Sequence, residues 1–201
     1  MNQCPANPIP KNNGLKRQQI LERNKCNENL SLLVFIKEDA KKYHKWSRAL
    51  RSVGFYVALS YRISHFLYRN RFGWIAALLQ GITASLTFCN INRKAVIGPG
   101  LALPHPTSIY IGPHVSIGEN SRFGPRIFIG SLYKYRDPSD YPVLSSGVTI
   151  AVGSTILGGI TIGEGVMIGP NEAVLKNIPD FHNVMSTPPK AFLRTVNGWE
   201  Q

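Results

Sequence analysis

Aliphatic or aromatic residues recur at every sixth position in the C-terminal half of this 201-residue chain. The recurring positions form three runs: Ile91, Ile97 and Leu103; Ile111, Ile117, Phe123 and Ile129; and Leu144, Ile150, Ile156, Ile162, Ile168 and Val174. An α-helix, with a period of about 3.6, does not keep this spacing, and neither does a strand, with a period of about 2. A chain that coils around a triangular prism does, because each flat side needs one inward apolar residue. The pattern therefore predicts a mainly β solenoid with thirteen rungs, or roughly four coils.

Helical patterns precede the six-residue repeat. Apolar residues at helical spacing run from Leu30 to Asn70, and a third apolar run begins at Gly73. This third run contains Gln80 and Thr83 and can pack on the preceding helices, so we expect a core helix and no membrane anchor. The predicted organisation is a disordered basic tail at 1–29, an α-helical N-terminal domain at 30–89, a β-helix at 90–178 and a C-terminal tail at 179–201.

The positive charge is concentrated near the N-terminus. Residues 1–72 hold 14 of the 23 Lys and Arg but only 4 of the 11 Asp and Glu. This excess of positive charge is typical of a solvated tail and polar helix faces. It is also compatible with weak contact with an anionic surface or membrane. The sequence has no zinc-ligand set and no RNA-binding aromatic motif, so no motif indicates a nucleic-acid partner. Three cysteines without metal-ligand spacing and the lack of an apolar leader favour a cytoplasmic protein.

Two interruptions of the six-residue repeat hold the candidate chemistry. Between Leu103 and Ile111 the repeat gains two residues in a segment, "PHPTS", that carries His105 between two prolines. Between Ile129 and Leu144 it gains nine more, in the segment "GSLYKYRDPSDYPV". Insertions in a solenoid leave the prism at its corners and commonly carry binding groups.

Four segments together resemble the hexapeptide-repeat acyltransferases, in particular the serine acetyltransferase branch with its colanic-acid-type polysaccharide O-acetyltransferase relatives. The segments are "SYRISHFLYRNRFGWIAALLQ", "IGPGLALPHPTSIYIG", "GVTIAVGSTILGGITIGEGVMIGPNEAVLKNIPD" and "TPPKA". The resemblance implies a left-handed parallel β-helix, a homotrimer with active sites between subunits, and acetyl-CoA as the acetyl donor.

The resemblance assigns catalysis to His105, which would take the proton of the acceptor hydroxyl, since a neutral imidazole can accept a proton near pH 7. Asn90 stands where the family places a carboxylate that orients this histidine. Pro104 replaces an aspartate of serine acetyltransferases, while Asp140 and Tyr141 replace an Arg-His pair that helps to hold serine. Arg126 and Arg136 are further candidates for the acceptor side.

The resemblance also places the donor. Contacts to the pantetheine arm fall on Gly130, Ser131, Val152, Gly169 and Pro170, and Lys190 falls near the nucleotide phosphates. Lys176 is a natural phosphate partner as well. Val152 stands where the family usually has alanine and would narrow the slot for the pantetheine arm. Pro170 lacks an N–H that could donate a hydrogen bond. No metal is expected, because the histidines do not reproduce the spacing of the metal-dependent relatives of this fold.

Three functional hypotheses follow. The first is an acetyl-CoA-dependent O-acetyltransferase acting on a sugar hydroxyl of a capsular polysaccharide, exopolysaccharide or lipopolysaccharide. The second is a serine O-acetyltransferase of cysteine biosynthesis. The third is a non-catalytic trimeric β-helix scaffold, which the replacements at Asn90 and Tyr141 would permit.

Overall fold

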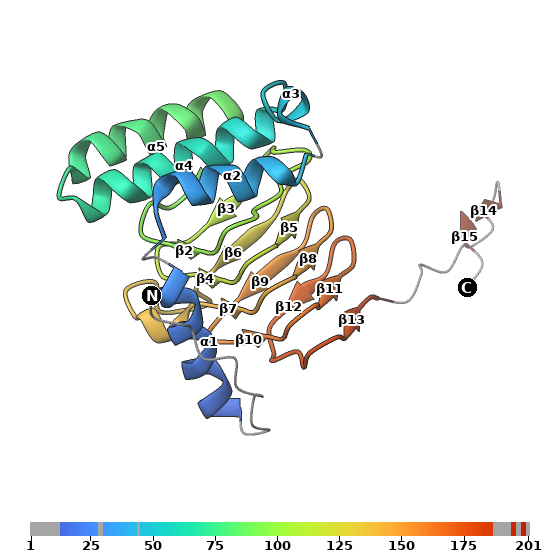
Figure 1. Ribbon diagram of the computed structural model, residues 1–201. Coiled ribbons are helices and arrows are strands. Elements are labelled where there is room, and N and C mark those ends of the chain that lie inside the picture. Colours follow the sequence, from blue (N-terminus) through green and yellow to red (C-terminus); the bar gives the residue numbers. More distant parts are fainter. Residues whose placement is uncertain (1–12, 28–29, 44, 187–193, 196–197, 200–201) are drawn as a thin grey trace.

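The computed structural model describes residues 13–27, 30–43, 45–186, 194–195 and 198–199. Its helices are α1 (Asn13–Asn27), α2 (Leu32–Lys41), α3 (Trp46–Ala49), α4 (Val53–Arg69) and α5 (Gly73–Thr87). Helices α2, α4 and α5 form a layer over the first coil of a prism, as Figure 1 shows. Among the described helices, none has both the length and the apolar character needed to cross a membrane.

The prism is a left-handed parallel β-helix, as predicted. Its first side, sheet A, contains β1 (Asn90–Ile91), β3 (Tyr110–Ile111), β6 (Phe128–Gly130), β9 (Thr155–Leu157) and β12 (Ala173–Val174). Its second side, sheet B, contains β2 (Val96–Ile97), β4 (Ser116–Ile117), β7 (Val143–Leu144) and β10 (Thr161–Ile162). Its third side, sheet C, contains β5 (Arg122–Phe123), β8 (Thr149–Ile150), β11 (Met167–Ile168) and β13 (Asn183–Val184). Beyond the prism, β14 (Arg194–Thr195) and β15 (Gly198–Trp199) pair antiparallel.

The predicted rungs form the core of the prism. All thirteen are buried, and none is more than 4% exposed. Strands in one sheet pair in register, so that Ile91, Ile111, Ile129, Ile156 and Val174 lie above one another inside sheet A. The six-residue spacing therefore correctly predicted which residue on each side of the prism points inward.

Left-handed backbone recurs at two of the prism's edges, and at the third, between sheets A and B, Gly158 adopts it. At the edge between sheets B and C, φ is positive at Gly100, Asn120, Gly147, Gly165 and Phe181. At the edge between sheets C and A, φ is positive at Ser108, Arg126, Gly153 and Asn171. Glycine and asparagine adopt this conformation most readily, which explains why they recur in the repeat.

The helical layer is attached to the first coil by a buried ion pair and a close backbone approach. Asp39 of α2 and Arg62 of α4 are 1% and 4% exposed, and their nearest atoms lie 2.9 Å apart. Helix α4 comes so near the prism that a Cβ on Gly54 would lie 1.7 Å from the carbonyl oxygen of Leu103. Only glycine at this position allows the approach.

The prediction of a disordered tail at 1–29 was wrong for residues 13–27, which form α1. This helix packs along sheet B, where Nδ2 of Asn24 donates to Oγ of Ser116 at 2.9 Å. Nζ of Lys16 lies 2.7 Å from Oδ2 of Asp180. Part of the basic charge expected in solvent thus makes specific contacts with the prism.

Candidate active site

His105 lies at the edge where sheet C passes into sheet A, which we call the C–A edge. Four stacked turns form it: residues 104–109, 124–127, 151–154 and 169–172. Backbone hydrogen bonds, from N–H to carbonyl, hold these turns above one another: Arg126 to Thr107 at 2.8 Å, Gly153 to Pro125 at 3.0 Å and Asn171 to Val152 at 2.8 Å. The edge is therefore a continuous row of turns along the prism.

The imidazole of His105 is exposed on this edge. The backbone around it is fixed, because the N–H of Thr107 donates to the carbonyl of His105 at 2.9 Å and Pro104 and Pro106 restrict the flanking residues. Within the described residues, the ring itself makes no hydrogen bond. It is available to accept a proton from a molecule that approaches from outside.

Asn90 lies on β1 beside the loop that carries His105. Its backbone N–H donates to the carbonyl of Ile109 at 2.7 Å, and its side chain is half-buried. Oδ1 of Asn90 accepts a 2.7 Å hydrogen bond from Nε2 of Gln80 on α5. Oε1 of Gln80 accepts from the backbone N–H and Nη1 of Arg93, both at 3.2 Å. Gln80 therefore fixes the orientation of the Asn90 amide.

The outer surface of sheet A continues from Asn90 with two aromatic rings. Tyr110 follows Asn90 in register, and Phe128 follows Tyr110. Their rings stack with centroids 4.5 Å apart and planes 13° apart. Burial raises the pKa of Tyr110, and the neighbouring Tyr141 adds to this effect. This surface offers a flat apolar wall between the two edges of the sheet.

The long insertion lies at the opposite edge, where sheet A passes into sheet B, which we call the A–B edge. Here Oδ2 of Asp140 accepts three backbone N–H bonds, from Leu132 at 3.1 Å, Tyr133 at 2.8 Å and Lys134 at 2.6 Å. These bonds, that of Lys134 foremost, lower the pKa of Asp140. Asp140 thus fixes the shape of the loop.

Tyr141 is almost enclosed, with 3% of its surface exposed. Its hydroxyl donates to the carbonyl of Tyr135 at 2.7 Å, and its ring meets that of His114 edge-on at 5.1 Å. Arg136 is exposed and donates from Nε to the hydroxyl of Tyr135 at 3.0 Å. Arg136 and Tyr135 therefore present their side chains to solvent, whereas Tyr141 does not.

Helix α1 holds the same loop from outside the repeat. The guanidinium of Arg17 donates to the carbonyls of Tyr141 at 2.7 Å, Ile160 at 3.0 Å and Ser139 at 3.3 Å. Burial lowers the pKa of Arg17. Neither Arg17 nor Gln80 was predicted from the sequence as a support of the site. The only signal for Gln80 was its position as a polar residue within an apolar helix.

The predicted donor-binding residues divide between the two edges. Val152, Gly169 and Pro170 lie on the C–A edge below His105 and Arg126. Gly130 and Ser131 begin the insertion at the A–B edge, and the exposed Lys176 lies at the same edge one coil beyond β9. Lys190 falls outside the described residues. The predicted donor-binding residues that the structure describes therefore lie at opposite edges of sheet A.

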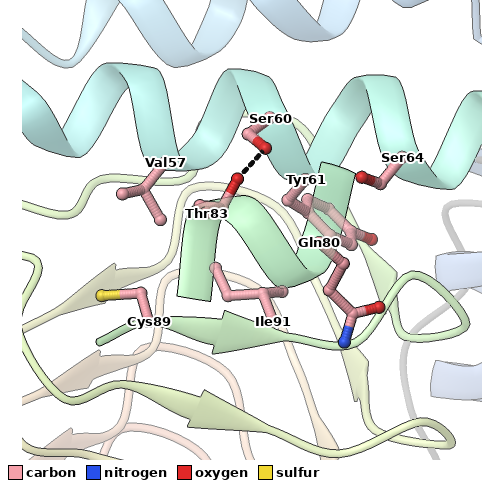
Figure 2. A pocket seen from close by; sticks show the side chains of 8 residues that line it. All are labelled: Val57, Ser60, Tyr61, Ser64, Gln80, Thr83, Cys89 and Ile91. Atoms are coloured by element: carbon pink, nitrogen blue, oxygen red, sulfur yellow. Dashed lines mark hydrogen bonds between the residues drawn. The ribbon is translucent and has the colours of Figure 1, made fainter. Parts of the chain in front are cut away.

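Two cavities among the described residues lie away from these edges. One, of about 450 Å³, lies between α2, α4 and β2. The other, of about 10 Å³, lies beneath α4 and α5 (Figure 2) and is lined by Ser60, Ser64, Gln80 and Thr83 among others. Its volume is close to that of one water molecule, and Oγ of Ser64 in its wall has no partner among the described atoms.

The described residues contain no cluster of three or more His, Cys, Asp and Glu suited to a metal ion.

Curated serine acetyltransferases resemble this chain over most of its length. That of Buchnera aphidicola (subspecies Schizaphis graminum) is 30% identical over 177 residues, which cover 84% of this chain and 68% of the relative. That of Helicobacter pylori strain J99 is 32% identical over 149 residues, covering 74% of this chain and 86% of the relative. No family model matches the chain.

Solved structures show the same similarity. The serine acetyltransferase of Neisseria gonorrhoeae, determined in complex with serine, is 25% identical and superposes with a TM-score of 0.73. The superposition covers 88% of this chain and 74% of that one.

Proposed function

The chain belongs to the serine acetyltransferase family and is an acyltransferase, and on this premise we propose that it transfers the acetyl group of acetyl-CoA to the hydroxyl of serine. One observation carries the proposal. An exposed histidine, His105, lies in a loop that breaks the repeat, at the top of an edge formed by stacked turns. The same edge carries Val152, Gly169 and Pro170, the residues expected to contact the pantetheine arm.

The proposed chemistry is a direct transfer. His105 takes the proton of the serine hydroxyl as that oxygen forms a bond to the thioester carbonyl carbon. The carbon–sulfur bond then breaks, and His105 returns the proton to the leaving thiolate. Asn90 acts on the histidine through its side-chain oxygen, which Gln80 already engages and which has a second lone pair for an imidazole N–H. It supplies orientation without the negative charge of a carboxylate.

A sugar hydroxyl of a polysaccharide or lipopolysaccharide unit is the second candidate acceptor. It is favoured by the residues that the long insertion carries in place of the expected serine-binding pair. The two positions where serine acetyltransferases are expected to hold serine carry Asp140, bound to three backbone N–H groups, and the enclosed Tyr141. Neither offers a positive charge to a serine carboxylate. Arg126 and Arg136 remain as exposed cations for either acceptor.

We propose that the complete site forms between two copies in a homotrimer. The support is geometric: His105 and the long loop flank sheet A at opposite edges, so a C–A edge needs the A–B edge of a neighbour to face it. Such an arrangement puts Lys176 of one copy at the same interface as Val152 and Gly169 of another.

The acceptor is tested by incubating the purified protein with acetyl-CoA and detecting the free thiol of CoA. We expect serine-dependent release, and we expect Arg126→Ala to weaken it mainly through KM. Release that requires a sugar and not serine would replace the first acceptor by the second. No release with serine or with a panel of hexoses and amino sugars would favour the non-catalytic scaffold.

A further inference from the structure

The long insertion is held together by its own hydrogen bonds. Oδ2 of Asp140 accepts from the N–H groups of residues 132–134, and the hydroxyl of Tyr141 donates to the carbonyl of Tyr135 at 2.7 Å. Both contacts join the end of the insertion to its earlier part. Residues 132–141 therefore form one hydrogen-bonded unit, and the position of this unit depends on how its end is attached to the prism.

Arg17 of helix α1 makes that attachment. Its Nη2 donates to the carbonyls of Tyr141 at 2.7 Å and Ser139 at 3.3 Å. Its Nη1 donates to the carbonyl of Ile160 at 3.0 Å, just before β10, so one guanidinium bridges the insertion and the next coil of the prism. Among the hydrogen bonds of the described residues, no other joins residues 131–141 to a residue outside the insertion.

Helix α1 has further anchors on both sides of Arg17. Nζ of Lys16 lies 2.7 Å from Oδ2 of Asp180, and Nδ2 of Asn24 donates to Oγ of Ser116 at 2.9 Å. These contacts hold the helix along sheet B, as Figure 1 shows. Replacing Arg17 should therefore leave α1 in place and remove only its contact with the insertion.

The contacts that begin at Arg17 end at an exposed cation. Tyr141, whose carbonyl Arg17 binds, donates its hydroxyl to the carbonyl of Tyr135. The hydroxyl of Tyr135 accepts a 3.0 Å bond from Nε of Arg136, and the guanidinium of Arg136 lies 5.5 Å from the centroid of the Tyr135 ring. Within the described residues the two terminal nitrogens of Arg136 donate to no acceptor, so they are available to an anionic or polar group of a substrate.

We propose that Arg17 is a positioning residue for the acceptor substrate, because it sets the place of Arg136 through Tyr141 and Tyr135. The inference rests on the proposed transfer of an acetyl group to an acceptor hydroxyl, and it gives helix α1 a part in that reaction. None of the hydrogen bonds that α1 makes to the described prism reaches the C–A edge, where His105 lies. Arg17 therefore affects the binding of the acceptor and not the proton transfer by His105.

Steady-state kinetics of the full chain test this separation. Arg17→Met should raise the KM for serine by about tenfold, because a displaced contact weakens acceptor binding. The kcat and the KM for acetyl-CoA should stay within about twofold of the wild type. Arg17→Lys should lie between the two, since an ammonium still donates to a carbonyl but lacks the planar fork. The matched control is Lys16→Met, which removes a neighbouring charge of the same helix whose partner, Asp180, lies outside the insertion.

A double-mutant cycle tests whether Arg17 acts through Arg136. Arg136→Ala should also raise the KM for serine, and the combined variant Arg17→Met, Arg136→Ala should have a KM close to that of the more impaired single variant. Increases that multiply in the combined variant would overturn the proposal. An unchanged KM in Arg17→Met, or an equal increase in Lys16→Met, would also overturn it.

Hydrogen exchange measured by mass spectrometry provides a readout that needs no turnover. The N–H groups of residues 132–134, which Asp140 binds, should exchange faster in Arg17→Met and at the wild-type rate in Lys16→Met. Amides around Ile20 should stay protected in both, which shows that α1 remains docked; if Arg17→Met releases α1, Arg17→Lys takes its place in the comparison. Unchanged exchange at 132–134 would overturn the proposal. Failure of the proposed function appears separately, as a wild type that releases no CoA with serine or with sugars.

Discussion

Replacing Asp39 by alanine should loosen the attachment of the helical layer to the prism. Oδ1 of Asp39 accepts the backbone N–H groups of Gly100 and Leu101, both at 2.8 Å, and its Oδ2 lies 2.9 Å from Nε of Arg62. Arg62 also donates to the carbonyls of Ile97 and Gly98. One carboxylate therefore joins α2 and α4 to the first coil.

The expected loss is large because the arginine stays behind. Breaking a buried ion pair by removing one partner costs about 3 to 5 kcal/mol, since the remaining charge is buried without compensation. For a chain of this size, each kcal/mol lowers Tm by about 2 to 4 °C. We therefore expect Asp39→Ala to lower the Tm by about 10 °C. The combined variant Asp39→Ala, Arg62→Met should lose less than the single variant, because it removes the unpaired charge.

Thermal unfolding followed by circular dichroism measures both losses, and Glu38→Ala provides the matched control. Glu38 is the preceding residue in α2 and pairs with Lys41 at 2.6 Å, but both side chains are exposed, so this change should cost less than about 1 kcal/mol. Equal Tm values for Asp39→Ala and Glu38→Ala would refute the reasoning. So would additive losses in the combined variant.

Three further predictions concern α1, Gln80 and assembly. The pKa of Asp180 is lowered: burial opposes this, but hydrogen bonds from Lys16 and the N–H of Glu164 outweigh it. The stabilisation from Asp180 is therefore present above the unfolded pKa of about 3.9 and is lost as the pH falls through the lower folded pKa. Lys16→Met should thus destabilise the protein at pH 7 and progressively less as the pH falls below about 3.9. A loss that does not change with pH would contradict this. Gln80→Leu should lower kcat for acetyl transfer with little change in KM, because it frees the Asn90 amide, whereas Gln80→Glu should retain more activity; identical kinetics would exclude a positioning role. Sedimentation should give a mass about three times 22.3 kDa, and a monomer would contradict a shared site.

The six-residue pattern predicted the prism because burial alone decides it. Each rung, from Ile91 to Val174, needs only an apolar side chain of suitable size at the inward position, and such positions are visible in a sequence. The two insertions were visible for the same reason, as departures from a regular spacing. His105 could therefore be placed at a corner before its surroundings were known.

Helix α1 was missed because contacts distant in sequence hold it. Among the residues of α1 whose burial is described, one large aliphatic side chain is buried, that of Ile20, beside the polar Asn24, so the composition resembles that of a disordered segment. The hydrogen bonds of Asn24 to Ser116 and of Arg17 to the carbonyl of Tyr141 span more than ninety residues. No local pattern signals such pairs.

The buried contacts of Asp39 and of Gln80 were hidden for a related reason. Asp39 stands among charged neighbours, and nothing local distinguishes it from the exposed Glu38. Gln80 and Asn90 are ten residues apart and meet only because α5 folds back over β1. The identity of a candidate base is local information, whereas the partners that orient it depend on the packed structure.

The rate of acetyl transfer by His105→Ala, per folded molecule, tests the central claim most directly. If His105 takes the acceptor proton, the variant should keep the wild-type Tm and bind CoA normally, because the imidazole is exposed and makes no described hydrogen bond. Its kcat with acetyl-CoA and the preferred acceptor should fall by about 10² to 10⁴, the usual contribution of general-base catalysis. A kcat within about twofold of the wild type would show that this edge does not carry the chemistry.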